Sequence, residues 1–250
     1  MKKLFSVIAL MVLLVSCGGT KSYKIDGTIA IDGLNDGDTI SLGYSVDGVN
    51  YTPETYAVIK DGKFEFSGNV ENCKLYYLVK HSTEEPLTML FLEGGNITAD
   101  INNESIAVRG TESNDLNAAL QESIMAPVSE MQEKQMRLYM DTTLTDEQRE
   151  AIIGELQATA DKVSGIAKEF VEKNIGTMAG LFMLIQCADM FDNDELSALM
   201  EKVPEANKDT NNNCLFSVLQ DIKEQRNNPQ DFSDMFNSAE DSTATEESAK

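Results

Sequence analysis

The chain has 250 residues, of which 42 are acidic and 20 are Lys or Arg, so the formal net charge is −22. This charge argues against a nucleic-acid ligand, because binding phosphates requires clustered Lys and Arg. A single His excludes metal sites built from several histidines of one chain. At 42% apolar residues the chain can bury a core, so wholesale disorder is excluded.

The first segment has the features of an export signal. Lys2 and Lys3 precede an apolar run over residues 4–15, which is too short to span a bilayer comfortably. The run ends in Leu14-Val15-Ser16-Cys17, which resembles the lipobox of bacterial lipoproteins. The resemblance implies that residues 1–16 are a signal peptide and that Cys17 is acylated. An ordinary signal peptide followed by an unrelated Cys is the alternative.

Residues 17–22 predict a flexible tether, because glycine-rich segments such as Gly18-Gly19-Thr20 behave as flexible coils. Two or three acyl chains would anchor the protein stably to a membrane. No Asp follows Cys17, so the inner-membrane retention signal of some lipoproteins is missing, and no acidic run resembles a surface-export signal. We therefore expect the periplasmic face of the outer membrane.

Residues 23–110 predict an antiparallel β-sandwich or barrel. Apolar and polar residues alternate over residues 23–31, and about seven further short runs follow. Between two of these runs, Asp61-Gly62 is a strong hairpin signal. Regularly spaced strands with glycine-rich turns are typical of sandwiches and barrels.

Residues 111–228 predict an all-helical region, which makes the expected fold class α+β. Apolar residues at helical spacing run from Leu116 to Leu138, with Gln135 as a lapse and Pro127 as a site that kinks or divides the helix. Thr145 with Gln148 predicts a capping box for a second long helix, so that the two form an antiparallel hairpin. Three further helices are expected, over residues 178–191, 194–202 and 213–226. Residues 229–250 predict an acidic disordered tail.

Several pieces of the first half resemble a known family in the order in which they occur. They are the opening strand over residues 23–27, the hairpin over 61–68, the segment 91–97 with Glu93-Gly94-Gly95, residues 108–111, and Asn114-Asp115. Together they are similar to the uncharacterised β-rich amino-terminal domain of Bacteroidota-type lipoproteins. In that family the domain usually precedes a thioredoxin-like thiol-disulfide reductase domain.

We expect this sequence to contain no counterpart of the thioredoxin-like half. Its chemistry needs a Cys-x-x-Cys pair, whereas Cys73, Cys187 and Cys214 are never three residues apart. We therefore transfer no redox activity and no catalytic residue from the family. Cys187 and Cys214 lie on two of the predicted helices, and the alternatives for them are a disulfide or two buried thiols.

Other polar residues have structural interpretations beside the functional ones. A loop cluster of Asp32, Asn35, Asp36 and Asp38 offers oxygen ligands for calcium, but turns explain it without a metal. Glu93 is interpreted as a turn residue, and His81 as an exposed polar residue. Three further residues are interpreted as a helix cap with its first turn: Asp192, Asp194 and Glu195.

The sequence therefore predicts no enzyme, no cofactor and no metal. It favours a non-catalytic binding or scaffold module of the cell envelope, with the membrane and an unidentified protein as partners. An accessory to a separate thioredoxin-like protein is one alternative, suggested only by the architecture of the family. A hydrolase that uses two carboxylates is the other.

Overall fold

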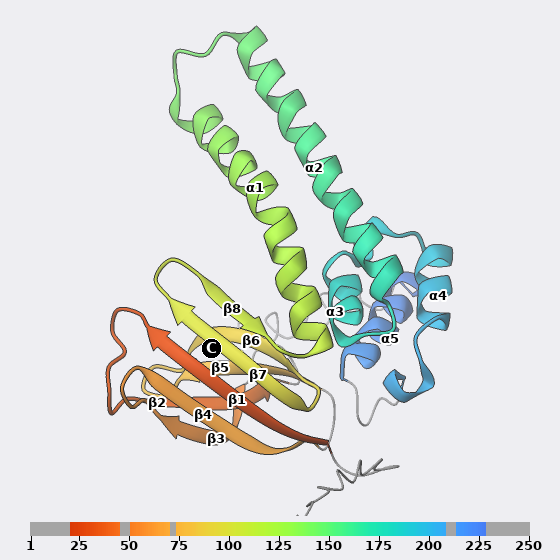
Figure 1. The fold of residues 1–250 in the computed structure, drawn as a ribbon. Coiled ribbons are helices and arrows are strands. Elements are labelled where there is room, and N and C mark those ends of the chain that lie inside the picture. The colour runs from red at the N-terminus through yellow and green to blue at the C-terminus, as the bar shows by residue number, and fades with distance from the viewer. Residues whose placement is uncertain (1–20, 46–50, 71–73, 209–213, 229–250) are drawn as a thin grey trace, which may run out of the picture.

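A computed structural model describes residues 21–45, 51–70, 74–208 and 214–228. It confirms the predicted α+β fold: two four-stranded sheets come first and the helices follow (Figure 1). The strands are β1 (Lys21–Ala30), β2 (Thr39–Ser45), β3 (Tyr51–Val58), β4 (Lys63–Val70), β5 (Lys74–Lys80), β6 (Glu85–Leu92), β7 (Gly95–Asn102) and β8 (Ile106–Arg109). The helices are α1 (Glu112–Met140), α2 (Asp146–Asn174), α3 (Met178–Gln186), α4 (Asn193–Glu201) and α5 (Cys214–Asn227).

The two sheets have the strand orders β4-β1-β7-β8 and β3-β2-β5-β6. All neighbouring strands are antiparallel except β1 and β7, which pair in parallel with Ile25 opposite Ile97. Because β1 lies between β4 and β7, it is hydrogen-bonded on both edges. The alternating apolar side chains of β1, β4 and β7 point inward and form one wall of the sandwich core.

The core between the sheets is made of aliphatic and aromatic side chains. Ile25, Ile40, Leu42, Leu78 and Ile97 are all fully buried there. The predicted Asp61-Gly62 turn joins β3 to β4, and both of its residues have positive φ, 51° and 66°. This is the backbone of a two-residue hairpin, which explains why the dipeptide predicted it.

A second core joins the sandwich to the helices. Leu75 of β5 and Phe91 of β6 lie on the outer face of their sheet and are buried against the helical region. The ring of Phe91 meets the ring of Phe182 on α3 edge to face, with centroids 5.9 Å apart. This sheet therefore has apolar residues on both faces at one end, unlike a sheet with one solvent-exposed face.

The helices α1 and α2 form the predicted long hairpin, which projects away from both the sandwich and the shorter helices (Figure 1). Pro127 is buried and lies inside α1, which runs through it as one helix from Glu112 to Met140. The Thr145 capping box is confirmed: the Thr145 hydroxyl accepts from the Gln148 N–H, and the Gln148 side chain accepts from the Thr145 N–H.

Two boundaries differ from the sequence prediction. The helix expected over residues 178–191 ends at Gln186, and Ala188–Met190 forms a separate 3-10 turn before the next cap at Asp192. Strand β1 begins at Lys21, so Lys21 and Ser22 belong to the sheet rather than to the predicted tether of residues 17–22. Both residues pair with β4, opposite Val70 and Asn69. The signal peptide, Cys17 and the tail of residues 229–250 lie outside the described residues.

Candidate functional site

The hairpin is attached to the sandwich through the first turn of α1. Glu93, at the end of β6, accepts a hydrogen bond from the Ser113 N–H at 3.0 Å and another from the Ser113 hydroxyl. The carboxylate thereby caps the start of α1, where N–H groups have no partner within the helix. Thr111, at the N-cap position, makes no such side-chain bond. Glu93 is thus a helix-capping residue rather than only a turn residue.

Asn114 makes the second attachment. Its side chain is 2% exposed, accepts from the Phe91 N–H at 2.9 Å and donates to the Phe91 carbonyl at 2.8 Å. The side-chain amide thus pairs with the backbone of β6 much as a further strand would. It provides hydrogen-bond partners for the N–H and the carbonyl of Phe91 at the edge of the sheet. These bonds fix where the hairpin leaves the sandwich.

Ion pairs and backbone bonds hold the far part of the hairpin together. Lys134 of α1 contacts Glu130 at 2.6 Å and, across the hairpin, Glu155 of α2 at 2.9 Å. Arg149 donates to the carbonyl oxygens of Leu138 and Asp141, both at 3.2 Å. Because α2 thereby binds the last carbonyls of α1, the connecting loop has a defined geometry.

Three large apolar side chains are exposed at the end of α1. Met136, Tyr139 and Met140 are 62%, 85% and 66% exposed, and we call them the tip patch. The two methionines lie one helical turn apart and therefore share a face. They contribute to a hollow of about 570 Å³, the tip hollow, lined by Gln132, Glu133, Met136, Arg137, Met140 and Asp141. Clustered exposed apolar residues of this kind mark interaction sites more often than single ones do.

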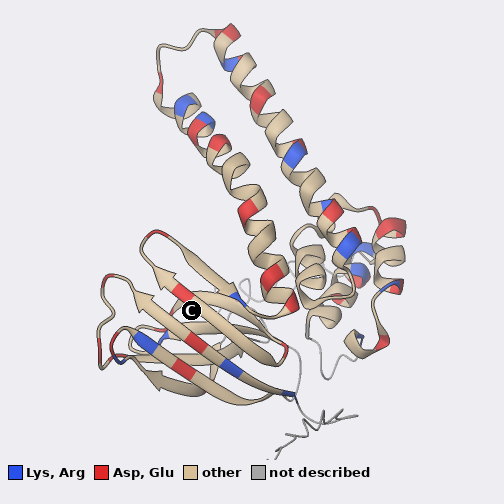
Figure 2. Cartoon of the chain, viewed as in Figure 1, with Lys and Arg blue, Asp and Glu red and all other residues tan. Residues whose placement is uncertain are grey.

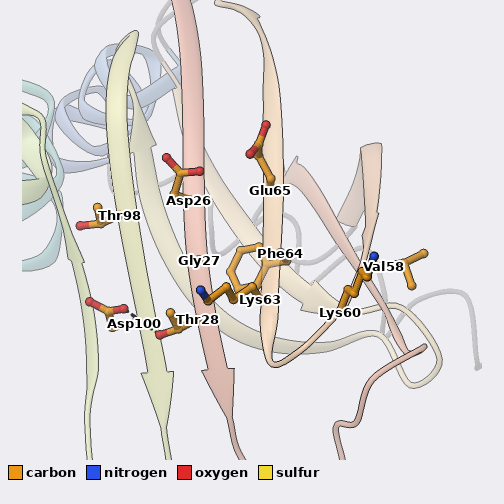
Figure 3. Close-up of a pocket in the computed structure, with 10 residues that line it drawn as sticks. All are labelled: Asp26, Gly27, Thr28, Val58, Lys60, Lys63, Phe64, Glu65, Thr98 and Asp100. Atoms are coloured by element: carbon orange, nitrogen blue, oxygen red, sulfur yellow. Dashed lines mark hydrogen bonds between the residues drawn. The ribbon is translucent and has the colours of Figure 1, made fainter.

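A second hollow, of about 610 Å³, lies on the outer face of the sheet that contains β1 (Figure 3). Its carboxylates already have partners. Lys24 contacts Asp26 at 2.7 Å and Glu65 at 3.2 Å, and the Thr28 hydroxyl donates to Asp100 at 2.7 Å. An acid–base pair for hydrolysis needs one carboxyl held neutral and one free carboxylate. Here the three carboxylates are engaged by a cation or a hydroxyl, which favours a solvated polar face.

The loop that offers oxygen ligands for calcium is occupied by turn hydrogen bonds. Asp38 accepts from the Asn35 N–H at 2.8 Å. Asp36 accepts from the N–H groups of Asp61 and Gly62, both at 2.9 Å, and so stabilises the hairpin turn between β3 and β4. Among the described residues, no three potential ligands of the types His, Cys, Asp and Glu are grouped to hold a metal ion. The turn interpretation therefore accounts for this cluster.

The remaining polar residues considered in the sequence analysis cap a helix or pack against another side chain. Asp192 and Glu195 form a capping box at the start of α4, and Asp192 also accepts from the Asp194 N–H. The ring of His81 lies 5.0 Å from that of Tyr56, edge to face, on the outer face of the second sheet. None of these residues lies among those that line the tip hollow.

Cys187 is a buried free thiol at the end of α3. Burial raises its pKa to about 11, although Lys168 acts in the opposite direction, so the thiol stays protonated at neutral pH. The side chain of Cys214 and the whole of Cys73 lie outside the described residues. In this structure Cys187 forms no disulfide, which favours the buried-thiol alternative for this residue over a bond to Cys214.

The fold and these contacts define a β-sandwich that carries a long helical arm with an apolar tip. Among the described residues, no helix is both long and apolar enough to cross a membrane. Residues 23–117 match the family model of a domain of unknown function, DUF4369. The matched segment includes Glu93, Ser113 and Asn114, so it covers the sandwich together with the attachment of the arm. No curated protein matches the chain.

Proposed function

We propose that this protein is a non-catalytic, lipid-anchored binding or scaffold module of the cell envelope, whose hairpin presents a docking site to another protein. The tip patch carries the proposal, because Met136, Tyr139 and Met140 lie exposed together at the end of an arm that projects from the body. An arm with a defined loop can hold such a surface away from the membrane to which the other end of the chain would be attached.

The proposed anchor rests on the sequence before the described residues. A basic start, an apolar run over residues 4–15 and Ser16-Cys17 together support acylation at Cys17 and residence on the periplasmic face of the outer membrane. The resemblance of the β-rich domain to those of Bacteroidota-type lipoproteins supports the same setting. An accessory role beside a separate thioredoxin-like protein is one form that the binding function could take.

The Cys17→Ala variant should lose its anchor. Without the thiol no diacylglycerol can be attached, so the variant should leave the membrane fraction or accumulate with its signal peptide uncleaved. Labelling with radioactive palmitate, followed by immunoprecipitation, measures this directly. The wild type should incorporate label and Cys17→Ala none. Absence of label on the wild type would refute the lipoprotein assignment.

The docking role is tested by crosslinking in intact cells. A photoreactive amino acid placed at position 139 should give a discrete adduct, because the Tyr139 side chain is 85% exposed within the patch. The matched control places the same group at the exposed position 158 of α2, outside the tip hollow. The adduct at 139 should disappear in a Met136→Ser/Met140→Ser background. Equal adducts at both positions, or none at 139, would contradict the proposal.

A further inference from the structure

We propose that the tip hollow binds a basic amphipathic helix of a partner protein. The inference rests on the proposed docking function and adds the chemical class of the docked segment. It is drawn from the apolar floor of the hollow, from the charge of the hairpin end and from the net charge of the whole chain.

The floor of the hollow suits the apolar face of a helix. Met136 and Met140 project from successive turns of α1. Their separation equals that of two apolar side chains four residues apart on an opposing helix, which could therefore pack against them. Methionine side chains are unbranched and polarisable, so they adapt to anchors of different shape. Beside them, Tyr139 adds a large aromatic side chain that is 85% exposed, and aromatic anchors often contribute most to binding.

The charge around this floor is acidic. Residues 130–155 contain seven acidic and three basic residues, a net charge of −4. Two of the three basic side chains are already engaged within the hairpin: Lys134 by Glu130 and Glu155, and Arg149 by two backbone carbonyls. Figure 2 shows acidic residues along both helices of the arm. The local field therefore favours a cationic partner.

Two acidic residues lie in the lining of the hollow itself, Glu133 and Asp141, together with the basic Arg137. Hydrogen bonds from the Thr143 hydroxyl and N–H lower the pKa of Asp141, with smaller contributions from Arg137 and Arg149. Asp141 therefore remains ionised well below neutral pH. Glu133 is exposed on α1, one turn before Arg137, and is available to a Lys or Arg of the docked helix.

A second copy of the chain is the less favourable occupant. Each copy would bring its own net charge of −22 and the same acidic hairpin end, so the two tips would repel each other at low ionic strength. A helix with an apolar stripe and flanking Lys or Arg would satisfy both the methionines and the acidic residues. Self-association is therefore the competing outcome that the experiment must distinguish.

The test uses the mature acylated protein in nanodiscs of neutral lipid, with empty nanodiscs as the blank. The probe is a fluorescent peptide of Leu and Lys, with Leu at i, i+3, i+4 and i+7, and fluorescence anisotropy measures binding. We expect saturable binding that weakens as salt is raised. The Met136→Ser/Met140→Ser variant should bind at least about tenfold more weakly. Glu133→Gln should bind several-fold more weakly and with a smaller dependence on salt.

Two controls test whether binding depends on the two methionines of the tip hollow and on the positive charge of the peptide. Met125→Ser removes an equally exposed methionine of α1 that lies outside the tip hollow, and it should bind the peptide as the wild type does. A peptide with Glu in place of Lys keeps the apolar stripe and should not bind. Circular dichroism of each variant checks that the hairpin remains helical.

Each alternative outcome overturns the inference in a recognisable way. Equal binding of the Lys and Glu peptides would mean that the hollow does not select charge. Unchanged binding by the double methionine variant would place the contact elsewhere. A dimer in analytical ultracentrifugation that the double variant abolishes would assign the surface to a second copy. If the crosslink at position 139 forms but the Lys peptide does not bind, the docking function stands and the partner is not a basic helix.

Discussion

Gly180→Ala should be among the most destabilising single substitutions in the helical half. A Cβ at this position would lie 1.9 Å from the carbonyl oxygen of Asn174 and 2.3 Å from its carbon, and both atoms belong to backbone. The same carbonyl accepts from the N–H and the hydroxyl of Thr177, so it cannot move away without breaking the turn between α2 and α3. We expect a loss of at least about 3 kcal/mol in the free energy of unfolding.

Urea unfolding followed by circular dichroism measures this loss, and the chain provides matched controls. Gly154 and Gly165 lie on the exposed side of α2, where an added Cβ would have no atom within 4 Å. Alanine there reduces the entropy of the unfolded chain and favours helix, so each control should gain about 1 kcal/mol. If Gly180→Ala behaved like these controls, the close approach of α3 to the end of α2 would be disproved.

Asn114→Ala should weaken the attachment of the arm to the sandwich. The substitution leaves the N–H and the carbonyl of Phe91 without their side-chain partner in a buried environment. Each unsatisfied group costs about 1–3 kcal/mol, so we expect a total loss of about 3 kcal/mol. The control is Asn117→Ala, the same change one turn further along α1, where the side chain makes no hydrogen bond to any described residue.

Hydrogen exchange separates a local effect from a global one. In Asn114→Ala the amide of Phe91 should exchange faster even under conditions where the amides of β1 remain protected, because its acceptor has been removed. In Asn117→Ala that amide should exchange as in the wild type. Unchanged protection of Phe91 in Asn114→Ala would show that the side-chain pair does not hold α1 to β6.

Local sequence patterns predict the helices, strands and turns, because each of these is determined by residues only a few positions apart. Alternation at period two marks the strands, Asp61-Gly62 marks the hairpin turn, and Thr145 with Gln148 marks the start of α2. The end of α3 at Gln186 is not predicted, since the apolar run continues to residue 191 while the backbone changes to a 3-10 turn. Apolar content alone does not show where a helix ends.

The attachment of the arm and the tip patch were not predicted, for two different reasons. The bonds from Asn114 to Phe91 and from Ser113 to Glu93 join residues 20 or more positions apart, and no local pattern encodes such a pairing. The tip patch does have a signal in the sequence. Met136 and Met140 are one turn apart and lie off the stripe that ends at Leu138, so a second apolar face could have been noticed. Their exposure could be established only from the packing of α1 on α2.

The central position of β1 has a consequence for how the chain folds. Its parallel partner β7 lies 72 residues further along, as Thr28 and Asp100 illustrate, so one edge of the first strand has no backbone partners until residues 95–102 follow. Contacts of such long sequence separation require the closure of a large loop and slow the folding of β proteins. When the chain is made from its N-terminus, β1 therefore waits for the backbone partners of both its edges until β4 and β7 follow. By contrast, we expect the α1–α2 hairpin, which is built from contacts between neighbouring helices, to form quickly.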